Sequence, residues 1–215
     1  AFLNEKSNVV FVDRDSESGS ALAKSLGTRG KFIEAELNTP ESCKQAVEKT
    51  FSFFGGVDVL VNNAAVQLRT ELKDTETRRW NLMQRVNVLG PFLLCKYVVP
   101  VMESQRSGSI INVTSGGYGS RGKGGVHYSV SKACLEQMTF SLAEEEREYG
   151  IAVNAWHPGS VLTEGVRATR PADFDFSRYD PMETVGPSTI YLANQTAETL
   201  TGQKVSRTEY GETWP

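Results

Sequence analysis

Tyr128 and Lys132 are the pair of side chains in this sequence best suited to proton transfer. They are four residues apart near the start of an expected helix, so they lie one turn apart on the same face. An ammonium group favours a neighbouring phenolate, and we expect Lys132 to lower the Tyr128 pKa from about 10 toward neutrality. General acid–base chemistry near pH 7 needs such a shift, although most pairs at this spacing are surface neighbours.

Ser115 and Asn87 are two further polar candidates on neighbouring segments. Ser115 ends an apolar, strand-like run and precedes a glycine-rich stretch, thirteen residues before Tyr128. Asn87 lies in a long expected helix, four residues before Pro91. Proline has no N–H, so the Asn87 carbonyl loses its helical partner and the helix should kink there. A freed carbonyl beside a polar side chain is able to hold a water; the alternative is that the proline only bends the helix around the sheet.

Asp13 is a candidate for binding a ribose. It directly follows the apolar run Val9 to Val12, at the end of a buried parallel strand, where open α/β sheets bind their ligands. A carboxylate there accepts hydrogen bonds from both adenosine ribose hydroxyls and repels a 2′-phosphate. The alternative is an ordinary turn or helix-capping residue.

Taken together, these residues and their order resemble one known family. The pattern consists of Asp13, Asn62-Asn63-Ala64-Ala65 in the place of an NNAG motif, Asn87, Ser115, Tyr128, Lys132, and Asn154-Ala155-Trp156-His157-Pro158-Gly159 followed by Val161 and Thr163. It is similar to the single-domain short-chain dehydrogenase/reductase pattern over nearly the whole chain. The conjunction is far more specific than any one motif.

The resemblance implies four catalytic residues and a cofactor. Tyr128 would move the proton of the substrate oxygen, and Ser115 would polarise the same carbonyl. Lys132 would lower the Tyr128 pKa and hold the nicotinamide ribose, while Asn87 would anchor a water in a proton relay. Hydride would pass between a nicotinamide cofactor and a secondary alcohol or ketone.

The same resemblance implies the cofactor contacts. They would involve Asp13 at the adenosine ribose, Glu36 and Leu37 beside adenine, Asn63 along the cofactor, Tyr128 and Lys132 near the nicotinamide ribose, and Val161 and Thr163 at the carboxamide. Asp13 favours NAD over NADP, although a basic residue such as Arg14 is able to face a 2′-phosphate.

Apolar strands alternate with amphipathic helices along the chain, which predicts a Rossmann-type α/β fold with helices on both faces of a parallel sheet. We expect strands at Val9 to Val12, Lys31 to Glu36, Val57 to Val61, Ser109 to Val113, Ile151 to Ala155 and near Gln203 to Val205. Expected helices cover Glu17 to Leu26, Pro40 to Phe54, Thr75 to Met102, Tyr128 to Tyr149 and Gly186 to Asn194. The strand runs do not alternate polar with apolar residues, so we expect both faces to be buried.

Three departures from the family pattern stand out. NNAA replaces NNAG, and the stretch Val205 to Gly211 lacks the usual Asp-Gly-Gly, which leaves the packing of the last strand open. The first strand and the glycine-rich TGxxxGxG turn are also absent from the sequence. That strand lies between strands two and four of the family's sheet, so we expect a sheet split at its centre. We therefore hypothesise an N-terminally incomplete enzyme; a cofactor-free, inactive scaffold is the alternative.

Composition limits the remaining classes. The 215 residues suit one domain, 1–215, and the net charge of −3 lacks the basic footprint of a nucleic-acid binder. Three cysteines without a CxxC motif suggest neither a disulfide framework nor a metal site, and no secretory signal is visible, which favours the cytoplasm. The longest apolar stretch, Val86 to Met102, is interrupted by polar residues and prolines, which argues against a membrane span. We expect a lid over residues 164–181 and, from the resemblance, a homodimer or homotetramer.

Overall fold

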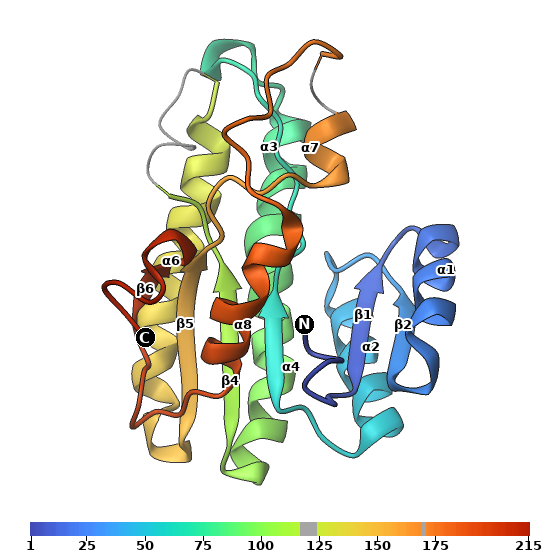
Figure 1. The fold of residues 1–215 in the computed structure, drawn as a ribbon, viewed down its shortest axis with the longest axis vertical. Coiled ribbons are helices and arrows are strands. Elements are labelled where there is room, and N and C mark those ends of the chain that lie inside the picture. The colour runs from blue at the N-terminus through green and yellow to red at the C-terminus, as the bar shows by residue number, and fades with distance from the viewer. Residues whose placement is uncertain (117–123, 169–170) are drawn as a thin grey trace.

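The computed structural model describes residues 1–116, 124–168 and 171–215, and shows parallel strands alternating with helices (Figure 1). The strands are β1 (Val9–Asp13), β2 (Gly30–Glu34), β3 (Val59–Asn62), β4 (Gly108–Val113), β5 (Ile151–His157) and β6 (Lys204–Ser206). The helices are α1 (Ser16–Leu26), α2 (Pro40–Phe54), α3 (Thr77–Gln84), the π-helical turn η3 (Arg85–Leu89), α4 (Gly90–Gln105), α6 (Val126–Glu145), α7 (Glu164–Ala168) and α8 (Gly186–Ala193). Short 3₁₀ turns cover Gly27–Arg29, Leu72–Asp74, Arg147–Tyr149, Met182–Val185 and Arg207–Glu209.

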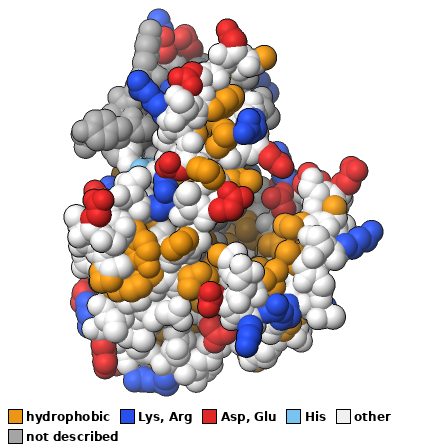
Figure 2. All heavy atoms as spheres, in the orientation of Figure 1, with side chains coloured by type: hydrophobic (Ala, Val, Ile, Leu, Met, Phe, Trp, Pro, Cys, Tyr) orange, Lys and Arg blue, Asp and Glu red, His pale blue; other side chains and the backbone are white. Residues whose placement is uncertain are grey.

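The strands form two separate parallel sheets in the described part of the chain. One has the order β1-β2 and the other the order β3-β4-β5-β6. Figure 1 shows the β1–β2 unit, with α1 and α2, standing beside the larger sheet, and Figure 2 shows a hollow between the two with hydrophobic side chains around it. The expected split of the sheet between β1 and β3 is confirmed.

The burial of the strands corrects one expectation. β4 is buried along its whole length and β5 up to Trp156, whereas every residue of β1 from Val9 to Val12 and of β3 from Val59 to Val61 is only partly buried. β1 is hydrogen-bonded only to β2, and β3 only to β4, within the described residues. The prediction that both faces of every strand are buried is therefore wrong for β1 and β3. These two strands lie at the edges of the split, and their apolar side chains stay partly exposed.

The ends of the elements follow local signals. Thr39 caps α2 by accepting from the Ser42 N–H at 3.3 Å, and Pro40 occupies the first turn, so α2 has the expected bounds. β2 ends earlier than expected, at Glu34, because its partner β1 ends at Asp13 opposite it. Glu36 and Leu37 therefore lie in the turn after the strand. The long helix expected from Thr75 is interrupted by the π-helical turn around Asn87.

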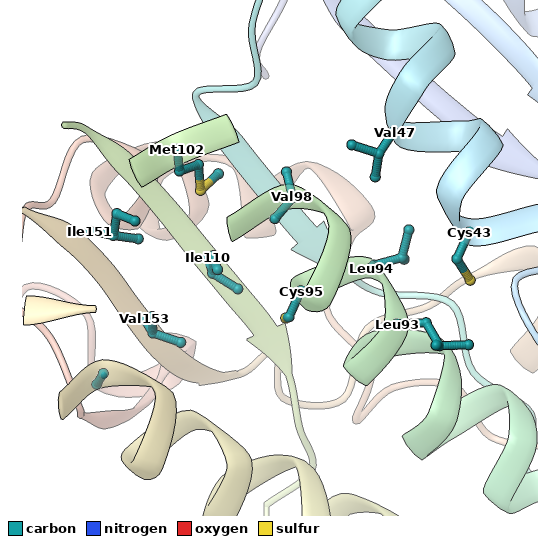
Figure 3. Packing of buried hydrophobic residues seen from close by; sticks show 11 residues of the cluster. Cys43, Val47, Leu93, Leu94, Cys95, Val98, Met102, Ile110, Ile151 and Val153 are labelled. Atoms are coloured by element: carbon teal, nitrogen blue, oxygen red, sulfur yellow. The ribbon is translucent and has the colours of Figure 1, made fainter. Parts of the chain in front are cut away.

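Two hydrophobic clusters cover opposite faces of the larger sheet. On one face α4 and α6 pack on β4 and β5, and Figure 3 shows Val98 and Met102 of α4 above Ile110 and Ile151. The same cluster reaches α2, whose Cys43 and Val47 lie against Leu93 and Leu94 of α4, and so joins the β1–β2 unit to the main body. On the other face α8 contributes Leu192 to a cluster with Ile111, Val113, Trp156, Val205 and Trp214.

The helical stretch Thr77–Gln105 has the length and composition of a membrane-crossing helix. The argument from interrupting residues is therefore not sufficient to exclude a span on sequence alone. In the structure Leu94, Val98 and Met102 of this stretch are buried in the core cluster. Its apolar character is accounted for by this packing.

Candidate active site

Tyr128 and Lys132 lie in the first turns of α6, as the spacing predicts. Lys132 is buried, with its side-chain nitrogen 5.7 Å from the centre of the Tyr128 ring. The same nitrogen donates a hydrogen bond of 2.7 Å to the carbonyl oxygen of Val113, the last residue of β4. α6 and β4 together hold the cation against the tyrosine.

Burial controls the protonation of both groups. Burial lowers the pKa of Lys132 from 10.5 to about 8. Burial also raises the pKa of Tyr128, and a hydrogen bond with Ser115 opposes part of that shift. The expectation of a lowered Tyr128 pKa is therefore wrong for this structure, because the loss of hydration of the phenolate outweighs the hydrogen bond with Ser115.

Ser115 reaches this pair from the end of β4. Its hydroxyl hydrogen-bonds with Tyr128. The next residue, Gly116, donates its N–H to Nδ1 of His157 at 2.7 Å, and Thr114 donates its N–H to the Trp156 carbonyl at 2.8 Å. The serine is thus held by the neighbouring strand β5. Most of the glycine-rich stretch after it, residues 117–123, lies outside the described part of the chain.

Asn87 lies in the π-helical turn η3 and is completely buried. Its amide nitrogen donates to the Val66 carbonyl at 2.9 Å and to Ser131 Oγ at 3.1 Å, while its side-chain oxygen accepts from the Val66 N–H at 2.8 Å. Its side chain therefore ties the segment after β3 to α6, one turn from Tyr128. The water that the sequence leads us to expect at the backbone carbonyl of Asn87 stays a prediction.

The residues predicted for the adenosine end lie on the β1–β2 unit. Asp13 is exposed, and its carboxylate accepts from the Asp15 N–H at 3.0 Å. Glu36 is also exposed and accepts a hydrogen bond from the Asn38 side chain, whereas Leu37 packs against the core cluster. The turn after β2 is thus fixed by Leu37 and leaves both carboxylates open.

The other predicted cofactor contacts lie at the ends of β3 and β5. Asn63 is exposed directly after β3. Val161 is partly buried and pairs with Asp180, and the exposed Thr163 accepts from the Val166 N–H at 3.2 Å. All of these positions follow the carboxyl ends of strands.

Both histidines hold loops around the site, a role that sequence reasoning missed. His127 is completely buried, with Nε2 2.6 Å from the Leu68 carbonyl. His157 accepts from Gly116, and burial, together with the charges of Lys204 and Arg207, lowers its pKa. Its position directly before Pro158 and Gly159, at the end of a strand, was the available signal.

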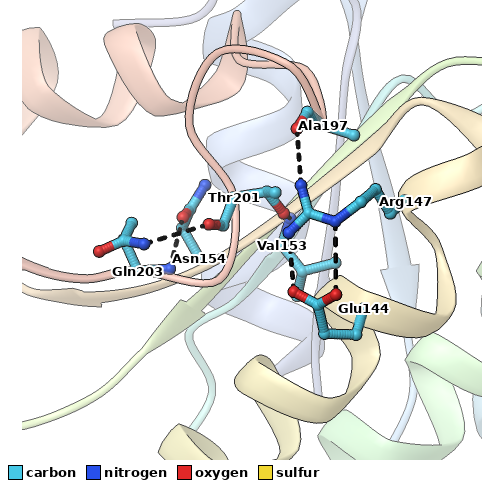
Figure 4. Close-up of polar contacts among 7 residues, drawn as sticks. All are labelled: Glu144, Arg147, Val153, Asn154, Ala197, Thr201 and Gln203. Atoms are coloured by element: carbon cyan, nitrogen blue, oxygen red, sulfur yellow. Dashed lines mark hydrogen bonds and ion pairs between the residues drawn. The ribbon is translucent and has the colours of Figure 1, made fainter.

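Asn154, in the motif at the end of β5, holds the chain that leads into β6. Its side-chain oxygen accepts from the Gln203 N–H at 3.1 Å, and the neighbouring Val153 N–H donates to Thr201 Oγ at 3.0 Å (Figure 4). β6 is further held by Trp214, whose ring nitrogen donates to the Ser206 carbonyl at 2.8 Å. The last strand therefore packs in the sheet without the Asp-Gly-Gly sequence.

Comparison with known proteins agrees with this geometry. The model of the short chain dehydrogenase family matches residues 1–173. The chain belongs to this family. An uncharacterized oxidoreductase of Thermotoga maritima is 38% identical over 174 residues, covering 78% of this chain and 67% of that protein. The 3-oxoacyl-[acyl-carrier-protein] reductase FabG of the same organism is 33% identical over 216 residues, covering 95% and 87%.

Solved structures of short-chain dehydrogenases share the fold. A gluconate 5-dehydrogenase from Burkholderia cenocepacia, in complex with NADP and tartrate, has a TM-score of 0.81 at 25% identity, covering 93% of this chain and 83% of that one. ElxO with NADP bound has a TM-score of 0.84 at 25% identity, covering 95% and 88%. The protein is an NAD(P)-dependent oxidoreductase that transfers hydride between a nicotinamide cofactor and an alcohol or ketone.

The residues present fit a nicotinamide dinucleotide at both of its ends. At one end Lys132 is a buried donor whose hydrogen bond to Val113 employs one of its three N–H groups. Beside it the Thr114 hydroxyl is buried without a hydrogen-bond partner in the described parts of the chain. At the other end Asp13 presents a carboxylate. The sequence holds no TGxxxGxG stretch for the pyrophosphate between them.

Proposed function

We propose that this short-chain dehydrogenase reduces or forms a ketone with Tyr128 as the proton donor or acceptor. The hydrogen bond between Tyr128 and Ser115, beside the buried ammonium of Lys132, carries the proposal. A raised Tyr128 pKa keeps the phenol protonated at neutral pH, ready to donate to a carbonyl oxygen. Ser115 donates a hydrogen bond to the same oxygen and so orients it.

Lys132 and Asn87 complete the proposed site. Lys132 holds the nicotinamide ribose through its remaining N–H groups, and its charge stabilises the phenolate that forms when Tyr128 gives up its proton. Asn87 holds the water that returns the proton. The nicotinamide cofactor, when bound, supplies or accepts the hydride. The protein contributes the position of the oxygen and the path of its proton.

We propose NAD as the preferred cofactor. The exposed Asp13 carboxylate supports this, because it accepts ribose hydroxyls and repels a 2′-phosphate. Arg14, next in the chain and also exposed, is the group that would favour NADP. The gluconate 5-dehydrogenase and ElxO structures hold NADP, so both cofactors need to be compared directly.

A homodimer or homotetramer in the cytoplasm completes the proposal. An apolar groove runs between α4 with its preceding π-helical turn and α6, and Leu89 and Phe92 are exposed on it. A second copy of the chain would cover these side chains.

The test is turnover by the purified protein of a panel of secondary alcohols and ketones, followed by nicotinamide absorbance. We expect turnover with a higher kcat/KM for NADH than for NADPH. Replacing Tyr128 with Phe should lower kcat by about 10²–10⁴-fold while cofactor binding persists. Tyr149→Phe is the matched control. Tyr149 lies in the 3₁₀ turn after the end of α6, away from the site, and its ring contacts the Arg106 guanidinium.

Three results would contradict parts of the proposal. Substantial activity of Tyr128→Phe removes Tyr128 from its role. A preference for NADPH reverses the inference from Asp13. If no substrate of the panel is turned over and calorimetry detects no NADH binding, the cofactor-free scaffold is the correct alternative.

A further inference from the structure

The chain between β5 and α8 folds back so that its two ends lie side by side. Val161 and Asp180 form a parallel bridge. The Leu162 N–H donates to the Asp180 carbonyl at 2.9 Å, and the Asp180 N–H donates to the Ser160 carbonyl at 2.8 Å. The stretch 158–163, which carries two predicted cofactor contacts, is therefore fixed by backbone pairing to Asp180.

Arg207, directly after β6, joins the same two ends with one side chain. Its Nε donates to the Pro158 carbonyl at 2.5 Å, and its guanidinium forms an ion pair with the Asp180 carboxylate. The Arg207 side chain is only 11% exposed, against 48% for Asp180. A guanidinium with one hydrogen bond to each end acts as a clamp on the base of this segment.

The backbone is adapted to this side chain. Gly159 has a φ of +76°, and a Cβ atom there would lie 2.9 Å from the Arg207 guanidinium nitrogen. Glycine at this position permits both the left-handed backbone and the close approach of the arginine. The Arg207 contact is thus built into the turn that follows β5.

We propose that Arg207 is a positioning residue for the cofactor. It holds the stretch 158–163, and with it Val161 and Thr163, in the geometry that receives the carboxamide of the nicotinamide. This inference rests on the proposed function for the role of Val161 and Thr163. The clamp itself, in which Arg207 joins Pro158 to Asp180, is independent of the proposed function.

The planar guanidinium is what suits arginine to this position. It presents donors in two directions, one to the carbonyl and one to the carboxylate. A lysine carries its charge on a single nitrogen. It would keep the attraction to Asp180 but lack the fixed arrangement of donors that reaches the Pro158 carbonyl at the same time. Arg207→Lys should therefore restore only part of the function that Arg207→Gln loses.

The test combines kinetics with hydrogen exchange. We expect Arg207→Gln to raise the KM for the nicotinamide cofactor about tenfold, the factor expected for loss of a hydrogen bond to a charged group, with a smaller fall in kcat. Amide exchange at Leu162 and Asp180 should become faster by a similar factor, measured without cofactor. Asp180→Asn should raise the cofactor KM and the exchange rate by smaller factors. The double variant Arg207→Gln/Asp180→Asn should have the same KM and exchange rate as Arg207→Gln alone, because the two residues act through one contact.

Lys44→Gln is the control, because Lys44 forms an exposed ion pair with Glu48 on α2. It should leave both readouts unchanged. Faster exchange in Arg207→Gln with an unchanged KM would overturn the positioning role, and unchanged exchange would overturn the clamp itself. If the unmodified protein turns over no substrate, the proposed function fails, and the exchange data still decide the clamp.

Discussion

Lys132 is a cation held in the protein interior, and it forms no ion pair with a carboxylate of the residues that the structure describes. It is only 4% exposed, and its hydrogen bond goes to the neutral Val113 carbonyl. Burying an ammonium group in this way disfavours its charged form, which is why its pKa falls to about 8. At neutral pH the buried charge of Lys132 therefore lowers the free energy of unfolding. The same burial places an N–H donor beside Tyr128.

Replacing Lys132 with Met should stabilise the protein while abolishing turnover. At pH 7 we expect the free energy of unfolding to rise by about 1–2 kcal/mol, since the cost of burying the charge disappears and the loss of the Val113 hydrogen bond offsets part of the gain. The measurement is urea unfolding of both proteins.

The pH dependence gives this prediction its sign. Between about 8 and 10.5 the unfolded chain carries more protons at Lys132 than the folded one, so the contribution of this group to stability rises with pH in that window and is lowest below it. The gap between Lys132→Met and the unmodified protein should therefore narrow above pH 8. A constant gap up to pH 10 would show that the charge of Lys132 is not the cause. The exposed Lys96 is the control, and Lys96→Met should change stability by less than about 0.5 kcal/mol.

At the scale of elements, the site depends on a loop held by two helices. The segment after β3 is bound at Val66 by Asn87 of the π-helical turn and at Leu68 by His127 of α6. The π-helical turn places Asn87 toward this loop and toward Ser131 at the same time. π-Helical turns often occur at functional sites, and here the turn connects three elements around Tyr128.

We expect Asn87→Ala to destabilise the protein by about 1–3 kcal/mol, because it leaves the N–H and carbonyl of the partly buried Val66 without their partners. Turnover should fall as well, since the loop and α6 lose their connection. Urea unfolding measures the first effect. Asn194→Ala is the comparison, because Asn194 is exposed directly after α8 and its side-chain amide donates to the Ile190 carbonyl one turn earlier. Equal losses in the two variants would remove the special role of Asn87.

At the scale of the whole molecule, the packing of α2 against α4 contributes to the arrangement of the two sheets. α2 packs against α4 through Cys43, Val47, Leu93 and Leu94, and this contact joins the β1–β2 unit to the larger sheet (Figure 3). Asp13 ends β1 of that unit, while Tyr128 and Lys132 lie in α6, which packs on the larger sheet. The distance between the two ends of the cofactor site therefore depends on α2 and α4.

The outer surface of α4 leads to a prediction about assembly. Phe92 is 49% exposed on the apolar groove between α4 and α6, and Phe51 of α2 is also 49% exposed but lies elsewhere. In light scattering we expect the unmodified protein to have the mass of a dimer or larger, and Phe92→Glu to shift it toward the monomer. Phe51→Glu should leave the mass unchanged. A monomeric unmodified protein, or an unchanged mass for Phe92→Glu, would contradict the proposed interface.

The sequence by itself determined the order of the strands and helices and the identity of the catalytic candidates. Local signals suffice for this: Thr39 and Pro40 start α2, and a spacing of four places Tyr128 and Lys132 on one face. The split between β1 and β3 also followed from sequence, because the resemblance places the family's first strand at that point of the sheet.

Only the tertiary structure decided how these groups ionise and what holds them. The Tyr128 pKa depends on burial, and burial is set by segments far away in the chain. Arg207 contacts Pro158, which is 49 positions away in the chain, and Asp180, which is 27 positions away. Hydration and long-range packing depend on the arrangement of elements in space, and a linear pattern of residue types does not contain that arrangement.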